Sequence, residues 1–266
     1  MAENSNQPGG FLPPSLPSPV PSNASSIPGS NLPHPRSQPL RAGSAKEEAA
    51  RRYVESRLLH ISRRYTKKHQ PPEADEVVHG YQSMAEVCKD LSEVVDVLWI
   101  SGTPSLQIPY LLNIALSVNT YLSAFLPAPT ATFALLRKLD HAFASLLKGE
   151  DVTSGETLPG FDQGRKGGMS RTDMVRCKSL VEATRVQIVE VMSREGEANE
   201  AMEEDTETAN ETGAETDGGF SVDAENAWDD ERGVHNMDVA RVYDNTIVQL
   251  GEILGAQIAY EAEAAR

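Results

Sequence analysis

Residues 77–99 read VVHGYQSMAEVCKDLSEVVDVLW, and this stretch decides the fold. A side chain suited to a core recurs in it every three or four residues, at Val77, Tyr81, Met84, Cys88, Leu91, Val95 and Leu98. A continuous seam of this period is typical of a long helix in a bundle. We therefore predict one helix over residues 73–99, which Gly102 ends.

The same spacing predicts helices on both sides of this stretch. Two capping boxes, Ser44-Ala-Lys-Glu47 and Ser170-Arg-Thr-Asp173, mark helix starts, and Thr103-Pro104 is expected to cap the helix that follows. The predicted spans are 44–68, 104–126, from the Pro127/Pro129 break to Gly149, 171–194 and 237–264. No segment shows the alternation of a strand. These elements predict an all-α protein, an antiparallel bundle of four to five helices with an additional C-terminal helix.

The third predicted helix, 104–126, has little polar surface. The sequence from Val97 to Leu136 contains no charged residue. Such a helix is buried either in protein or in lipid. Several amides and hydroxyls, a proline at each end and the lack of flanking Lys or Arg favour a protein core over a membrane span.

Composition divides the chain further. Ten of the 17 prolines lie in the first 39 residues, so we predict a disordered tail over 1–43. Residues 195–231 contain 15 Asp or Glu and no Lys or Arg, whereas the rest of the chain is neutral. We predict a helical domain over 44–194, an acidic disordered linker over 195–233 and a C-terminal amphipathic helix within 234–266.

The cysteines indicate a reducing compartment. Cys88 and Cys177 fall in predicted helices without paired spacing, which is not a disulfide framework. The first residues do not resemble a signal peptide. We expect a nuclear or cytoplasmic protein that is not secreted.

Catalytic and metal-binding patterns are missing from the sequence. The six histidines do not form a metal-ligand spacing, neither cysteine belongs to a C-x-x-C pair, and no G-x-S-x-G occurs. The glycine-rich loop 160–168 precedes a helix and contains Arg165 and Lys166, but its spacing departs from a P-loop. We expect no cofactor, no metal and no enzymatic activity.

The first predicted helix is strongly basic. Between Arg41 and Lys68 there are nine Lys or Arg and three Glu. This pattern fits either a solvated face or a surface for an anionic partner such as nucleic acid. The candidate residues are Arg51, Arg52, Arg57, Arg63, Arg64, Lys67 and Lys68.

A second candidate surface lies near the C-terminus. The apolar stripe of the last helix must be buried on the bundle or on another chain. The candidate docking residues are Phe220, Val222, Trp228, Tyr243, Ile247, Leu250 and Leu254. These features favour a non-catalytic adaptor or subunit of a larger intracellular assembly with protein partners, and the nucleus is its favoured location. The alternative is a nucleic-acid-associated protein that uses helix 46–68, and an enzyme without a recognisable motif ranks third.

Overall fold

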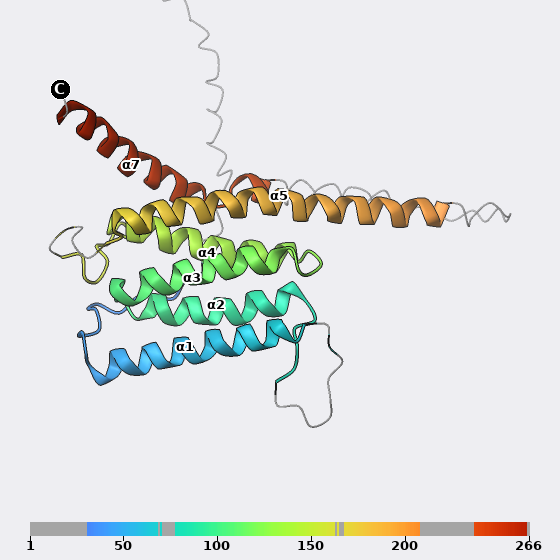
Figure 1. Ribbon diagram of the computed structural model, residues 1–266, viewed down its shortest axis with the longest axis horizontal. Helices are drawn as coiled ribbons and strands as arrows, with labels where there is room; N and C mark the ends of the chain where they lie inside the picture. The colour runs from blue at the N-terminus through green and yellow to red at the C-terminus, as the bar shows by residue number, and fades with distance from the viewer. Residues whose placement is uncertain are drawn as a thin grey trace, which may run out of the picture.

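The computed structural model describes residues 31–68, 70, 78–162, 164, 168–207 and 237–264, without the side chains of 194–207 and 256–264. These ranges contain an all-helical bundle (Figure 1). Its helices are α1 (Ala45–Thr66), α2 (Met84–Ile100), α3 (Pro104–Leu122), α4 (Pro129–Lys148), α5 (Arg171–Glu207) and α7 (Asp244–Ala264). Within the described ranges there is no strand, only an isolated bridge between Glu150 and Thr157. The prediction of a helical bundle is confirmed.

The core forms where α2 and α4 meet the other helices. Helix α2 contacts α1, α3 and α4, while α5 packs along α3 and α7 packs on α4. Six of the seven predicted seam positions, from Tyr81 to Leu98, are buried, and Val77 lies outside the described residues. The period of the sequence thus identified the buried face correctly.

The start of α2 differs from the prediction. The helix begins at Met84 instead of residue 73, because Ser83 accepts the backbone N–H of Glu86 and caps it. Tyr81 precedes the helix but is still fully buried. Because Tyr81 lies four residues after Val77 and three before Met84, it matched the helical spacing although it is not part of the helix.

The predicted capping box at Ser170 forms in full, whereas at Ser44 only the hydroxyl bond forms and the Glu47 carboxylate accepts the N–H of Gly43 instead. Ser44 accepts the N–H of Glu47, and Ser170 accepts the N–H of Asp173. Thr103 is the N-cap residue of α3 and is followed by Pro104 in the first turn, as predicted, but its hydroxyl donates to the carbonyl of Ser101 and makes no side-chain cap bond.

The predicted N-terminal tail includes a segment with defined contacts. Residues 31–43 run along the turn between α2 and α3, where the N–H of Leu40 donates to Thr103 Oγ1 at 2.8 Å. Leu32 packs against the core. Residues 1–30 of this predicted tail lie outside the described ranges.

Helix α5 continues beyond residue 194, its predicted end, to Glu207. The additional residues are mostly Glu and Ala, which favour helix. Figure 1 shows this part of α5 extending past the ends of the bundle helices. The rest of the predicted acidic linker, 208–233, lies outside the described residues.

Candidate interaction surfaces

The predicted anionic-partner residues of α1 do not form one free basic face. Arg51 pairs with Glu47 and Arg52 with Glu48, each one turn away on α1 itself. Arg63 is exposed. Lys68 donates to the Tyr65 hydroxyl at 3.2 Å and lies 4.4 Å from the centre of its ring. Lys67 is half-buried at the end of the helix.

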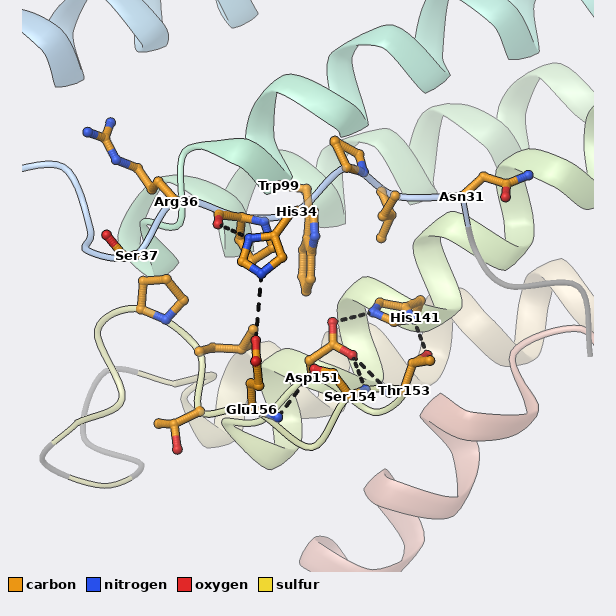
Figure 2. A pocket seen from close by; sticks show the side chains of 16 residues that line it. Asn31, His34, Arg36, Ser37, Trp99, His141, Asp151, Thr153, Ser154 and Glu156 are labelled. Carbon is orange, nitrogen blue, oxygen red and sulfur yellow. Dashed lines mark hydrogen bonds and ion pairs between the residues drawn. The ribbon is translucent and has the colours of Figure 1, made fainter.

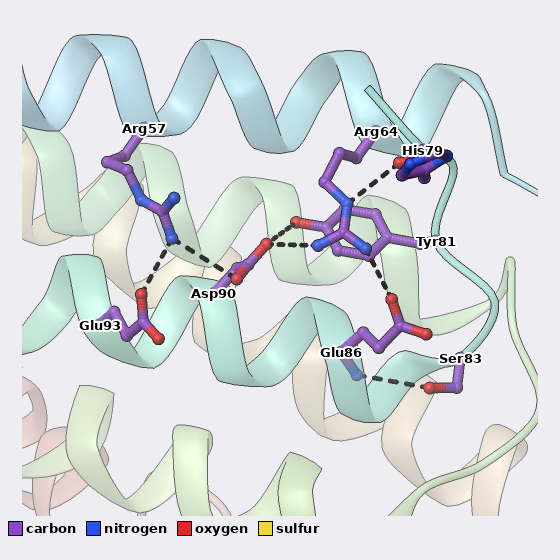
Figure 3. A network of polar contacts seen from close by, with 8 residues as sticks. All are labelled: Arg57, Arg64, His79, Tyr81, Ser83, Glu86, Asp90 and Glu93. Carbon is purple, nitrogen blue, oxygen red and sulfur yellow. Dashed lines mark hydrogen bonds and ion pairs between the residues drawn. The ribbon is translucent and has the colours of Figure 1, made fainter. Parts of the chain in front are cut away.

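The other two cations, Arg57 and Arg64, point toward α2 (Figure 3). Arg64 donates to Glu86 at 2.6 Å and to Asp90 at 2.9 Å. Arg57 donates to Glu93 at 2.9 Å and lies 3.5 Å from Asp90. Both arginines therefore hold two helices together instead of facing solvent.

Asp90 is the centre of this network. It also accepts the hydroxyl of Tyr81 at 2.7 Å, and the guanidinium of Arg64 lies 4.0 Å from the centre of the Tyr81 ring. Burial first, and then this hydrogen bond, raises the pKa of Tyr81 far above its usual range. Sequence reasoning missed these contacts because they depend on how α1 and α2 lie against each other. Binding of nucleic acid by the remaining cations stays a prediction.

The C-terminal segment is fixed to the bundle by Asp140 of α4. Its carboxylate accepts the backbone N–H of Thr246 at 2.8 Å, the hydroxyl of Thr246 at 2.7 Å and the side-chain amide of Asn245 at 2.9 Å. These donors lie in the first turn of α7, so Asp140 supplies a cap from another helix. A negative charge here also complements the helix dipole.

Two arginines strengthen the attachment. Arg137 of α4 pairs with Asp238 at 3.3 Å, and Arg185 of α5 donates to the carbonyl of Val242 at 3.2 Å. Tyr243 lies between these contacts with a positive φ of 58° and is buried against Phe143.

These contacts place the predicted docking residues of the last helix on this chain. Tyr243 and Leu250 are core residues, and Ile247 and Leu254 pack partly buried against the core. These four side chains therefore pack in cis, which is one of the two predicted alternatives, and their contact with a partner stays a prediction. The other predicted docking residues, Phe220, Val222 and Trp228, lie outside the described residues.

A pocket of about 650 Å³ lies between residues 31–37 and the loop after α4 (Figure 2). His141 lies there with one ring nitrogen 2.9 Å from Asp151 and the other 3.4 Å from the Thr153 hydroxyl. The order hydroxyl, imidazole, carboxylate resembles a hydrolytic triad. However, 3.4 Å exceeds the roughly 2.6–3.2 Å range of an activated hydroxyl.

The loop itself explains this arrangement. Asp151 accepts the backbone N–H groups of Thr153 and Ser154, each at 2.8 Å, which is an Asx turn. Burial raises the pKa of Asp151, but the hydrogen bonds from Ser154, His141 and Thr153 outweigh it and hold the pKa below its usual value. The three side chains therefore fit a role in fixing the loop over Trp99.

The helix start that follows the glycine-rich loop is already capped by a carboxylate of its own first turn. The carboxylate of Asp173 accepts the hydroxyl and the N–H of Ser170 at the first turn of α5. An anion would meet this carboxylate at the same place. Arg165 and Lys166, the cations of the predicted site, lie outside the described residues.

Both thiols are buried. Burial raises the pKa of Cys88 to about 11 and that of Cys177 to about 12. Among the described residues, His, Cys, Asp and Glu form no group of three or more suited to a metal ion. None of the described helices has the length and apolar character needed to span a membrane.

Helix α3 has an exposed face without a charge, which we name the α3 outer face. It consists of positions spaced three or four apart, Ser105, Pro109, Asn113, Leu116, Thr120 and Ser123. Leu126, just beyond the helix, is 86% exposed. The sequence prediction treated the uncharged run as wholly buried, whereas only the opposite face of α3 lies in the core.

Comparison with known proteins gives one family. The family model TFB6, described as subunit 11 of the general transcription factor TFIIH, matches residues 80–251. This is more than half of the 266 residues and covers α2 to the middle of α7, but not α1. No curated protein and no solved structure matches the chain.

Proposed function

Since the chain belongs to the TFB6 family, subunit 11 of the general transcription factor TFIIH, we propose that it is a non-catalytic subunit that binds other proteins of that complex in the nucleus. The family match over residues 80–251 is the observation that carries this proposal. The helical bundle is consistent with it, because such folds present long rigid faces to partners.

We further propose that the α3 outer face is the surface that a partner covers. A surface helix normally has charged side chains on its solvent side. The centres of protein interfaces, in contrast, are depleted of charge. An exposed helix face of neutral polar and apolar residues fits the second situation better than the first.

The local hydrogen bonds of α3 support this reading. Thr120 donates its hydroxyl to the carbonyl of Leu116 at 3.1 Å, and Ser117 donates to Asn113 at 3.0 Å. Their hydroxyl protons are already satisfied within the helix, so covering them with a partner leaves fewer unpaired donors. The apolar side chain of Leu116, 45% exposed, would supply a contact near the middle of the face.

Affinity purification of the full chain tests whether it binds other subunits of TFIIH. The tagged chain is expressed in the cells of its source and purified from nuclear extract. We expect TFIIH subunits to co-purify in amounts comparable to the tagged chain. Their absence from a preparation in which the tagged chain itself is folded would contradict the proposed function.

A further inference from the structure

Helix α1 buries far fewer side chains than α3 or α4. Only Glu47, Val54 and Ile61 are buried among its residues, whereas α3 and α4 each bury at least a dozen. The family match begins at residue 80, after α1. Helix α1 therefore lies before the residues that the family model matches, and it adds two side chains, Val54 and Ile61, to the core.

The contact side of α1 repeats every seven residues. Val54 and Ile61 are its buried apolar positions, and Leu58 and Tyr65 are its half-buried ones. Arg57 and Arg64 stand between them with the same spacing of seven. The helix thus presents one pattern twice: an apolar residue, an arginine three positions later and a hydrophobic residue directly after it.

The opposing side of α2 matches this pattern in charge. Glu86, Asp90 and Glu93 share one face of α2, and each arginine lies between two of these carboxylates. Without α1, three like charges at spacings of three and four would repel one another. This face is therefore more stable with a cationic helix opposite it.

Helix α3 supplies the second wall. The Tyr65 ring lies 4.1 Å from the ring of Tyr121 and 6.1 Å from that of Phe125, measured between centres. Tyr110 donates its hydroxyl to Glu55 at 2.5 Å. The α2 side of this surface is acidic and the α3 side is aromatic. A helix that binds here must therefore carry both cationic and hydrophobic side chains.

We propose that the surface of α2 and α3 beneath α1 is a docking groove for a basic amphipathic helix of a protein partner, with α1 as its displaceable occupant in cis. The incoming helix would carry apolar residues and arginines in the heptad pattern of α1. This site is separate from the α3 outer face and goes beyond the proposed function.

Tethering explains how α1 would keep the groove closed. Residues 67–83 join it to α2, and a short linker gives an effective concentration on the order of millimolar. A separate helix therefore occupies the groove only if it binds there much more tightly than α1 does, or if the contacts of α1 with the groove are weakened. The second route gives a direct experiment.

The probe is a fluorescent synthetic peptide of residues 45–68, titrated into the full chain and followed by anisotropy. In R57E/R64E the tethered helix loses its ion pairs with α2, and we expect the peptide to bind at least tenfold more tightly than to the wild type, with affinity falling as salt rises. The matched control is R52E/R63E, which has the same charge change at an arginine paired within α1 and at an exposed one. It should behave like the wild type.

Adding Asp90→Lys to R57E/R64E should abolish the gain. The proposal is overturned if R57E/R64E binds the peptide no better than the wild type does, or if R52E/R63E gains as much affinity.

Hydrogen exchange of the wild type is an independent test that needs no variant. We expect α1 amides to exchange much faster than those of α3 and α4, and equal protection would overturn the proposal as well.

Discussion

The carboxylate of Asp140 accepts the backbone N–H of Thr246 at 2.8 Å and caps a helix that begins more than a hundred residues later in the chain. Asp140 is 7% exposed and Thr246 is fully buried, so the bonds between these two residues are shielded from water. This side chain joins α4 to the C-terminal segment and, together with the ion pair of Arg137 and the burial of Tyr243, holds α7 on the bundle in cis.

Replacing Asp140 by Ala should therefore destabilise the protein. The change removes the cap and leaves the buried N–H and hydroxyl of Thr246 without an acceptor, a loss of about 2–3 kcal/mol. Urea denaturation measures it, with Asp162→Ala, at an exposed loop carboxylate, as the control. Equal midpoints for both variants would show that Asp140 does not hold α7.

The turn after α4 requires a glycine for two separate reasons. Gly149 has φ +83°, and a Cβ placed there would lie 2.8 Å from the Phe161 ring. Gly155 has a similar φ of +72° but open space around it. Gly149→Ala should thus cost about 1–3 kcal/mol more than Gly155→Ala, because only the first adds overpacking to backbone strain. Thermal unfolding of the two variants side by side gives this difference, and similar losses would contradict it.

The thiols of Cys88 and Cys177 should resist alkylation in the native protein. Their raised pKa values of about 11 and 12 leave almost no thiolate at pH 8, and both side chains are buried. Iodoacetamide followed by mass spectrometry should show modification only after unfolding. Rapid labelling of either cysteine in the folded chain would contradict the packing of α2 or α5.

The loop carboxylate Asp151 should contribute stability that depends on pH. Its pKa is lowered in the folded state, so the contribution is present above the ordinary pKa of Asp, about 3.9, and is lost as the pH falls through the folded value. The stability difference between the wild type and Asp151→Asn should shrink as the pH is lowered from 5 to 2. If the stability difference grew over this range instead, the pKa of Asp151 would not be lowered on folding.

The sequence predicts which faces are buried better than it predicts where helices begin. The period through Met84 and Leu98 identified the buried side of α2, because burial follows helical spacing. The same period continues back to Val77, so the predicted start of α2 was placed too early, at residue 73. The pattern Ser83-Met-Ala-Glu86 matches a capping box and could have located the true start. Local chemistry was the better guide at this boundary.

The surfaces were harder to predict because they depend on contacts between distant segments. Nothing in the local sequence indicates that Arg64 meets Asp90, or that Asp140 meets Thr246. The uncharged run through α3 was visible, but hydropathy cannot distinguish a buried neutral residue from an exposed one. Asn119 is buried and hydrogen-bonded to α5, whereas Asn113 faces outward.

The most direct test of the account is whether the α3 outer face holds the chain in TFIIH. The variant Leu116→Arg/Thr120→Arg places two charges on this face, and Gln82→Arg/Ala134→Arg places the same charges at exposed positions elsewhere. Both are purified as tagged full chains from nuclear extract, after circular dichroism confirms that they are folded. We predict that the first retains at most a tenth of the TFIIH subunits bound by the wild type, equivalent to at least about 1.4 kcal/mol of binding energy, while the second retains them all. Equal recovery of TFIIH with both variants would contradict the account.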